Sequence, residues 1–400
     1  MIDFQQIISR AYDSIGASKS ASFCVNGAGS ADCVDRVGCV DRTDCTTALD
    51  SVGCNGSILI DSNYNYVNQN LIVTSDNIAA INRLILDDEM SRVDMVYMDP
   101  PFYSSSDYYA KVPWEKNRTI EMVAYRDKLD LESYLVDITA SIISAKQILK
   151  DTGSLWIHLD HHIVHYIKVI ADEIFGGQDH FINEIIWQYK SGGAGRRSFS
   201  RKHDTILFYA KDPKKYKFFP IKEKSYNRQG KPYRFKGVEE FSDEHGYYTM
   251  VNAKDVWEIP MVGRTSAERT GYPTQKPQKL LEKMILSATS ADDIVLDLYG
   301  GSGAVAACAY ELGRRFISID CSDLSALFTM RRLEALPCSD YTWIRDAKLP
   351  YARDDEILSL IRNVADRAMV AEAMSSNRSL LSSEMYGLDI FGRGSILTES

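Results

Sequence analysis

The segment DIVLDLYGGSGAVAACAYELGRRFISID restricts the fold of this chain more than any other stretch. An apolar run from Ile294 to Leu298 is followed by a glycine-rich turn, a helical pattern and a second apolar run from Phe316 to Ile319. This order is that of a βαβ unit, in which a helix joins two parallel strands. The sequence therefore predicts an α/β fold built on a parallel sheet.

The turn in this unit is a candidate cofactor site. Gly300, Gly301 and Gly303 let the backbone approach a ligand at the helix N-terminus, and Asp320 ends the second strand, where a carboxylate can bind two ribose hydroxyls. The spacing is G-G-x-G and not the G-x-G-x-x-G of NAD sites, and nothing else suggests hydride transfer. A cofactor without phosphates, such as S-adenosyl-L-methionine, suits the shorter turn.

A second motif consists of Asp99, Pro100, Pro101 and Phe102, directly after the apolar run VDMVYM. An exocyclic base amine is a weak nucleophile, because its lone pair is delocalised into the ring. An aspartate and a backbone carbonyl that accept its two N–H groups shift it toward sp³ geometry. The prolines hold Asp99 and the Pro100 carbonyl rigidly, and the Phe102 ring can stack on a base swung out of a duplex. Together the two motifs predict an amino-group methyltransferase.

Five segments, in this order, resemble the β class of DNA amino-methyltransferases. They are the stretch from NLIVTSD to DPPF, then NEIIWQYKSGGAGRRSFSRKHDTILFYAKD, KDVWEIP, GYPTQKPQKLLEKMIL and DLYGGSGA, and they span about residues 70 to 335. The likeness is strongest to adenine-N6 enzymes, including the modification subunits of type III restriction systems. In that class the catalytic motif precedes the cofactor motif, and the target-recognition region lies between them.

The resemblance implies a role for each matching residue. Asp99, Pro100, Pro101 and Phe102 would hold the flipped base. S-adenosyl-L-methionine would be bound by a set of residues from four segments: Asp76, Thr274, Lys276, Asp297, Gly301, Gly303 and Asp320. One departure is the loop after the catalytic motif, which carries Tyr103 and three serines in place of the familiar residues.

The implied function is methylation of the adenine N6 amine in double-stranded DNA. Cytosine-N4 methylation on the same scaffold is an alternative, although an initial Asp in the catalytic motif favours adenine. A non-catalytic DNA-binding subunit that retains the fold is another alternative, which the intact motifs oppose. A restriction subunit and a second copy of the chain are further candidate partners.

The charge distribution also favours a nucleic-acid partner. The whole chain has a formal net charge of −9, but residues 187–236 contain fifteen Lys or Arg and three acids, a net charge of +12. Aromatic residues are interleaved with these cations, as in surfaces that contact phosphates and bases. A solvated basic face is the alternative. The arginine-rich segment SGGAGRRSFSRKH supplies most of the candidate DNA-binding residues: Lys190, Arg196, Arg197, Arg201 and Lys202.

Two possible metal sites are set aside. Cys33, Cys39 and Cys45 recur every six residues, whereas zinc sites prefer paired C-x₂₋₄-C spacings. The cluster of Asp160 with three histidines follows a strand at a helix start, where polar side chains cap the helix without a metal. No metal is expected, since a sulfonium donor is already activated for transfer.

The predicted organisation is a doubly wound, Rossmann-like α/β methyltransferase sheet with an inserted target-recognition region. No apolar run reaches the roughly eighteen residues that span a bilayer, and the N-terminus has no signal pattern, so a cytoplasmic location is expected. The proposed divisions are an irregular Cys-containing segment (1–60), a catalytic half (70–210), a basic recognition region (187–265), a cofactor-binding half (266–350) and a C-terminal helix and tail (351–400).

Several regular elements are predicted within these divisions. The expected strands are Asn70–Thr74, the run ending at Met98, and the segments SLWIHL, NEIIWQY and TILFY. The expected helices are Asn77–Asp88, Leu131–Leu149, Gln278–Ala288 and one within DDEILSLIRNVADRAMVAEAM.

Overall fold

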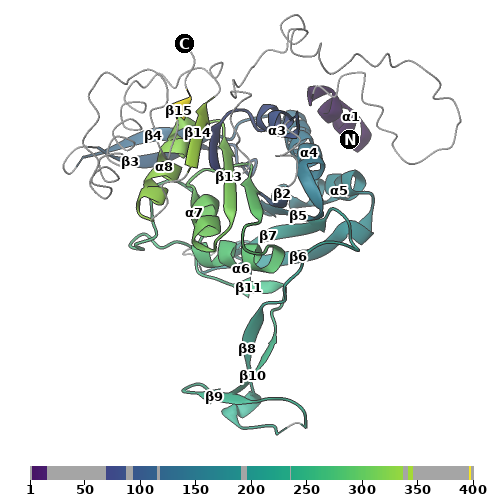
Figure 1. Ribbon diagram of the computed structural model, residues 1–400, viewed down its shortest axis with the longest axis vertical. Helices are drawn as coiled ribbons and strands as arrows, with labels where there is room; N and C mark the ends of the chain where they lie inside the picture. Colours follow the sequence, from purple (N-terminus) through teal and green to yellow (C-terminus); the bar gives the residue numbers. More distant parts are fainter. Residues whose placement is uncertain are drawn as a thin grey trace, which may run out of the picture.

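A ten-stranded sheet forms the centre of the protein in the computed structural model (Figure 1). The structure describes residues 2–15, 69–86, 93–114, 118–190, 196–234, 236–336, 341–345 and 396–397. In spatial order the strands are β11 (Val256–Glu258), β6 (Phe181–Gln188), β7 (His203–Ala210), β5 (Leu149–Leu159), β2 (Val93–Met98), β12 (Ile294–Asp297), β13 (Arg315–Asp320), β1 (Asn70–Thr74), β14 (Tyr341–Arg345) and β15 (Ile396–Leu397).

All neighbouring strands of this sheet are parallel except at β7, which is antiparallel to both β5 and β6. The chain places β5 on one side of β2 and later inserts β12 on the other side, so the strand order reverses between β2 and β12. In doubly wound sheets ligands bind beyond the carboxyl ends of the strands at such a reversal. The predicted fold class is confirmed.

The central strands are buried on both faces, as parallel strands covered by helices must be. All six residues of β2 and all four of β12 are buried. The predicted strands are confirmed, and β5 begins earlier than expected because the backbone becomes extended at Leu149, directly after the preceding helix ends.

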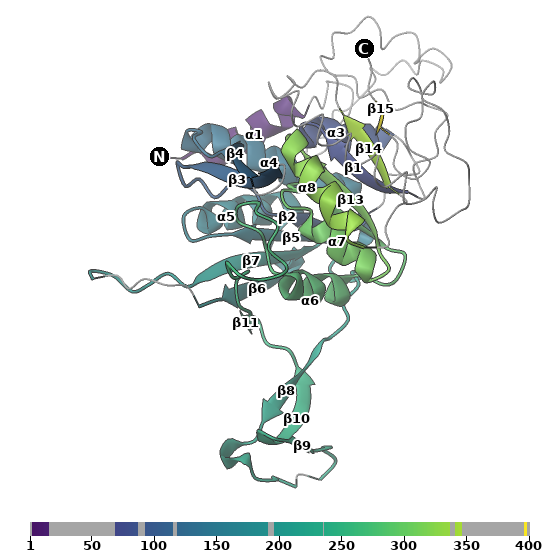
Figure 2. The ribbon, with the colours of Figure 1, turned by 90° about the vertical axis from the view of Figure 1, so that its left-hand side faces the viewer.

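Helices cover both faces of the sheet (Figure 2). One core lies under α1 (Phe4–Ser14), α3 (Asn77–Leu86), α4 (Leu131–Ile148) and α5 (Val164–Phe175), and the other under α6 (Gln278–Ala288), α7 (Ala304–Glu311) and α8 (Asp323–Glu334). Short 3₁₀ turns occur at Gln178–His180 and Arg228–Gly230. Local caps explain several helix starts: the Asp130 carboxylate accepts from the Ser133 N–H before α4, and the Ser322 hydroxyl accepts from the Leu324 N–H before α8.

The N-terminal residues differ from the expected irregular segment. Asp3 caps α1, whose buried side chains include Ile7 and Ala11 and pack against α4. This helix was not predicted, because residues 1–60 were interpreted together from the unusual composition of their cysteine-containing part. The regularly spaced cysteines and the predicted C-terminal helix lie outside the described residues.

Two antiparallel insertions were not predicted. The hairpin of β3 (Asp107–Trp114) and β4 (Arg118–Arg126) follows the catalytic motif. A second insertion, made of β8 (Lys222–Tyr226), β9 (Phe241–Asp243) and β10 (Gly246–Asn252), forms a separate three-stranded sheet that projects from the body as an arm (Figures 1 and 2).

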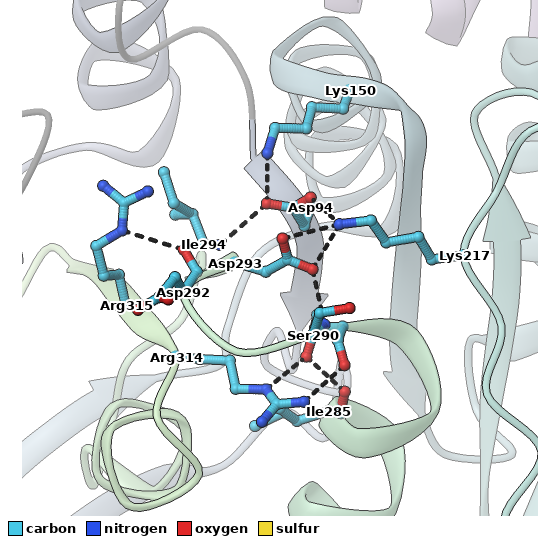
Figure 3. Close-up of polar contacts among 11 residues, drawn as sticks. Asp94, Lys150, Lys217, Ile285, Ser290, Asp292, Asp293, Ile294, Arg314 and Arg315 are labelled. Carbon is cyan, nitrogen blue, oxygen red and sulfur yellow. Dashed lines mark hydrogen bonds and ion pairs between the residues drawn. The ribbon is translucent and has the colours of Figure 1, made fainter.

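A buried ion cluster joins the base of this arm to the sheet (Figure 3). The Asp94 side chain is completely buried in β2 and binds Lys150 Nζ at 2.7 Å and Lys217 Nζ at 2.9 Å. Lys217 also binds Asp293 at 2.6 Å, just before β12. Lys217, which belongs to the predicted basic region, thus neutralises carboxylates inside the protein.

We expect Asp94→Asn to lower the free energy of unfolding by about 3 kcal/mol, because two lysines lose a buried counter-ion. The matched control is Asp151→Asn, since Asp151 pairs with Lys215 at the surface, with both side chains more than half exposed. That change should cost less than about 1 kcal/mol. Urea denaturation of the three proteins measures the difference, and equal losses in both variants would contradict a special role for the buried cluster.

No helix in the described part of the chain combines the length and the apolar character needed to cross a membrane.

Candidate active site

Several carboxylates gather at the carboxyl edge of the sheet. Asp99 follows β2, Asp297 ends β12 and Asp320 ends β13, and these three strands are adjacent and parallel. Asp160 follows β5 at the same edge. The sheet topology therefore brings together residues from both predicted motifs, which are about two hundred residues apart in the sequence.

The Asp99 carboxylate has two different environments for its two oxygens. Oδ2 accepts a short, charge-assisted hydrogen bond from Lys276 Nζ, and the Lys276 side chain is almost fully buried. Oδ1 is also buried but has no hydrogen-bond partner among the described residues. A buried carboxylate oxygen without a donor is costly, which points to a donor supplied by a ligand.

Phe102 lies beside this carboxylate. Its ring centroid is 5.2 Å from Lys276 Nζ and 6.0 Å from the centroid of the His158 ring, with the two rings nearly parallel. The preceding backbone is held from α4, where the Tyr134 hydroxyl donates to the Pro101 carbonyl at 2.6 Å. Phe102 is only partly buried, so part of its ring can meet a planar ligand.

The loop after Phe102 has a strained backbone. Tyr103 and Ser105 both have a φ of 58°, which is unusual for residues with a side chain. The buried Asp127 holds this loop: its carboxylate accepts from the Ser104 N–H at 2.6 Å, and its own N–H donates to the Ser106 carbonyl. The unfamiliar residues of this loop are thus built into a defined turn at the site.

The glycine turn connects β12 to α7. Gly301 has a φ of 49°, and its N–H donates to the Asp320 carboxylate at 2.9 Å. Gly303 has a different role, since a Cβ there would lie 2.5 Å from the Thr329 Cα in α8. Gly303 therefore permits the close packing of α7 on α8, and Gly301 and Asp320 shape the turn itself.

The carboxylates of this turn are electrostatically unusual. Burial raises the pKa of Asp297 to about 8, and the neighbouring Asp99 and Asp320 carboxylates add to the rise. Burial also raises the pKa of Asp320. Neither carboxylate forms an ion pair within the described residues, so a cationic, hydroxyl-bearing ligand would complement them.

The remaining predicted cofactor residues lie at the same edge in different settings. Asp76 is exposed and caps α3, with its carboxylate accepting from the N–H groups of Ile78 and Ala79. Thr274 has a φ of 54°; its hydroxyl is 3.3 Å from the Tyr125 hydroxyl, and its carbonyl accepts from Lys276 Nζ. Lys276 therefore binds the Asp99 carboxylate, a contact that its predicted role in cofactor binding did not include.

The predicted DNA-binding residues lie within the connection between β6 and β7, which leaves the sheet at the carboxyl end of β6. Lys190, Arg196, Arg197 and Arg201 are exposed and form no ion pair with the described residues, and Lys202 is partly buried. The stem of this connection is defined, because the Tyr189 N–H donates to the Lys202 carbonyl at 2.9 Å. We call residues 190–202 the basic loop; residues 191–195 lie outside the described part.

Other cations of the predicted basic region are already paired. Lys215 binds Asp151 and Asp212, Lys217 lies in the buried cluster, and Lys224 binds Asp243 in the arm. The count of +12 for residues 187–236 therefore overstates the charge available to a partner, because acids from elsewhere in the chain neutralise part of it.

Three of the four residues of the Asp160–histidine cluster lie close together. Potential ligand atoms of Asp160, His161 and His162 lie within 4.8 Å of one another, and His165 is not part of the group. The Asp160 carboxylate accepts from the His162 N–H at 2.8 Å, and its carbonyl accepts from the first residue of α5. These contacts are those of a turn that starts a helix.

Sequence reasoning missed some polar residues behind Phe102. His158, Tyr97 and Asp204 form a buried hydrogen-bonded group, described below. A signal was present: His158 interrupts the apolar run SLWIHL of β5, and a buried polar residue needs partners.

Comparisons with known proteins agree with this arrangement. The Type II methyltransferase M.HpaI of Haemophilus parainfluenzae is 28% identical over 255 residues, covering 62% of this chain and 69% of the relative. M2.DpnII of Streptococcus pneumoniae is 26% identical over 289 residues, covering 70% and 95%. The DNA adenine methyltransferase YhdJ of Escherichia coli (strain K12) is 24% identical over 269 residues, covering 66% and 82%.

The family comparison covers the same part of the molecule as the site. Residues 93–324 match the N6_N4_Mtase model, described as DNA methylase. This match runs from the first residue of β2 to the start of α8, and so includes both motifs and every strand between them. With more than half of its length matched, and with both motifs at one edge of the sheet, the chain belongs to the DNA methylase family.

Proposed function

We propose that the protein transfers a methyl group from S-adenosyl-L-methionine to the N6 amine of adenine in double-stranded DNA, after flipping the base out of the duplex. One observation carries this proposal: Lys276 binds one oxygen of the Asp99 carboxylate, and the other oxygen, near the Phe102 ring, is buried and has no donor among the residues that the structure describes. An exocyclic amine stacked against Phe102 supplies the missing N–H.

Asp99 and Lys276 have complementary tasks in this mechanism. The Lys276 ammonium holds Oδ2 and thereby directs Oδ1 toward the substrate. Oδ1 accepts one N–H of the amine, the Pro100 carbonyl accepts the other, and the nitrogen lone pair turns out of the ring plane. Because the acceptors are already in place, no reorganisation is needed when the nitrogen becomes a nucleophile.

The glycine turn is the proposed cofactor site. S-adenosyl-L-methionine, when bound, supplies a methyl group already activated by a sulfonium. Its hydroxyls and positive charges match the partly buried Asp320 and the buried Asp297 carboxylates, and Gly301 leaves room for close backbone approach. Asp76, Thr274 and Gly303 complete the proposed set, with Gly303 contributing through the packing of α7.

Cofactor binding should release a proton from Asp297. With a pKa of about 8, this carboxyl is mostly protonated at pH 7, and a cationic ligand favours its ionised form. Cofactor affinity should therefore rise with pH and level off above about pH 8. Calorimetry at pH 7 in buffers of different ionisation enthalpy measures the protons released, and Asp297→Asn should release fewer than the parent.

The same carboxyl affects stability in the absence of cofactor. Because its pKa is about 8 in the folded protein and near 3.8 when unfolded, the folded state alone keeps this proton between these values. Its contribution to stability is thus largest below about pH 4 and is lost as the pH rises to 8. Relative to Asp297→Asn, the parent should lose stability across this range, and a constant difference would contradict the shifted pKa.

Adenine is preferred over cytosine on two grounds. The catalytic motif begins with Asp, and one of the relatives, YhdJ, is named a DNA adenine methyltransferase. The order of the motifs supports the β class. We also propose a narrower likeness to type III modification subunits, a restriction-subunit partner, a homodimer and a cytoplasmic location. The relatives M.HpaI and M2.DpnII are themselves named Type II methyltransferases.

The proposed DNA interface is the basic loop, within a recognition region spanning 187–265. The catalytic half (70–210) and the cofactor-binding half (266–350) contribute strands to one sheet. The two halves therefore differ in their proposed chemical roles but are not separately folded domains. The exposed cations Arg196, Arg197 and Arg201 lie in the connection that leaves the sheet at its carboxyl edge, the edge that carries Asp99.

The test is incubation of the purified protein with duplex DNA and methyl-labelled S-adenosyl-L-methionine, followed by mass spectrometry of the nucleosides. We expect N6-methyladenine, and sequencing of the product identifies the methylated position. N4-methylcytosine would overturn the adenine assignment. Cofactor binding without any methyl incorporation would instead support a non-catalytic subunit.

A further inference from the structure

A buried polar group lies directly behind Phe102. The His158 side chain is fully buried in β5, and each of its ring nitrogens has a partner from a neighbouring strand. Nδ1 is 2.9 Å from the hydroxyl of Tyr97 in β2, and Nε2 is 3.2 Å from the Asp204 carboxylate in β7. None of the three belongs to the catalytic motif or the glycine turn.

These two contacts fix the orientation of the imidazole. Although burial opposes ionisation of Asp204, its hydrogen bond and charge interaction with His158 keep the pKa of this carboxyl below its usual range. An ionised carboxylate only accepts, so Nε2 carries a hydrogen and donates it. Rotating the ring would break two buried hydrogen bonds, each costly to leave unmade. The Trp187 ring, edge-on to His158 at 5.4 Å, restricts it further.

The held imidazole is in contact with Phe102. The two ring centroids are 6.0 Å apart with an interplanar angle of 29°, an offset stack. Phe102 follows the end of β2 and lies outside any helix or strand, so neighbouring side chains determine the plane of its ring. In the described part of the chain, its ring partner is His158 and its cation partner is Lys276.

The group is also connected to the basic loop. The Tyr189 hydroxyl donates to the second oxygen of Asp204 at 2.9 Å, and the Tyr189 N–H forms the stem of the loop with Lys202. Asp204 itself lies two residues after Lys202. The Asp204 carboxylate therefore accepts hydrogen bonds from His158, which lies against Phe102, and from Tyr189, which forms the stem of the basic loop.

We propose that His158 is a positioning residue for the flipped base: Tyr97 and Asp204 hold its ring, and that ring sets the plane of Phe102 on which the base stacks. Tyr189 couples this support to the stem of the basic loop, so that the loop and the stacking surface share one rigid frame. The inference rests on the proposed function, since it requires Phe102 to stack on a base.

A purely structural role predicts a different pattern of effects. A buried hydrogen bond that only stabilises the fold should change the free energy of unfolding and leave the bound base and its reaction unaltered. A positioning role should change the geometry of the stacked base, and hence the transfer step, at saturating DNA and cofactor. Misplacement of a reacting group by about 1 Å can cost up to about 10² in rate.

The experiment compares Tyr97→Phe with Tyr209→Phe as a matched control. Both tyrosines are buried and lose only a hydroxyl, but the Tyr209 hydroxyl donates to Asp172 in α5, away from Phe102. The readouts are the single-turnover methylation rate and the fluorescence of a duplex carrying 2-aminopurine at the position that sequencing identifies as methylated.

For Tyr97→Phe we expect a rate about fivefold lower, the equivalent of one hydrogen bond, and an altered 2-aminopurine signal, with cofactor affinity unchanged. His158→Phe should lower the rate further. If His158→Phe does not fold, the result for Tyr97→Phe alone tests the inference. Parent-like rate and fluorescence in Tyr97→Phe, or equal effects in Tyr209→Phe, would overturn the inference. A parent protein that never methylates DNA would instead refute the proposed function.

Discussion

Asp99→Asn is expected to lower the rate of methyl transfer by about 10² to 10³. The reason lies in the pairing with Lys276, which is buried and donates to Oδ2. An asparagine must turn its amide oxygen toward this ammonium, and its NH₂ group then occupies the place of Oδ1. A donor would face the N–H of the substrate amine, so a nearly isosteric change removes the acceptor on which the proposed mechanism depends.

The measurement is single-turnover transfer of labelled methyl groups, with cofactor affinity followed in parallel by calorimetry. Affinity should stay near that of the parent, because Asp99 is proposed to act on the acceptor amine. Asp160→Asn is the matched control: this carboxylate also follows a strand at the same edge, but its contacts belong to the turn before α5. Near-normal turnover in Asp99→Asn would show that the catalytic motif is wrongly assigned.

The second large effect concerns DNA binding. If Arg196, Arg197, Arg201 and Lys202 each neutralise a phosphate, their joint replacement by Ala should reduce the log-log salt slope of DNA binding by about 3.6 units, about 0.9 for each contact. Three of these cations are exposed and without an ion pair in the described residues, so their charge is available to a partner.

DNA affinity across a salt series, with cofactor present, measures this slope. A charge-matched control replaces four cations outside the recognition region, namely Arg10, Lys111, Lys128 and Lys279, and should leave the slope close to that of the parent. Identical slopes for the parent and the basic-loop variant would mean that the loop does not contact the backbone. The arm, with Lys222 and Arg228, would then be the next candidate.

Local sequence patterns were sufficient for most of the central fold. Helix α6 has the predicted bounds, and β1 and the end of β2 agree with the prediction, because apolar periodicity, continuous apolar runs and the proline before α6 act within a few positions. The hairpin of β3 and β4 was not predicted, although apolar and polar residues alternate in part of DYYAKVPW. The segment directly follows Asp99–Phe102 and was therefore interpreted as a loop.

Charge counting succeeded less well, for a physical reason. A sequence window shows how many cations it holds, but not which acids approach them in space. Lys217 is neutralised by Asp94 and Asp293, which are 123 and 76 residues away, and this pairing arises only when β7, β2 and β12 lie in one sheet.

The sequence by itself therefore determined the fold class, the motif order, and the placement of Asp99, Asp297 and Asp320 at strand ends, because each depends on short-range patterns and on the rule that parallel strands end at one edge. Only the tertiary structure decided that Lys276 binds Asp99 across 177 residues, and that His158 stands between Tyr97 and Asp204. Such contacts depend on strand order and on the path of the intervening chain, and no local pattern encodes either.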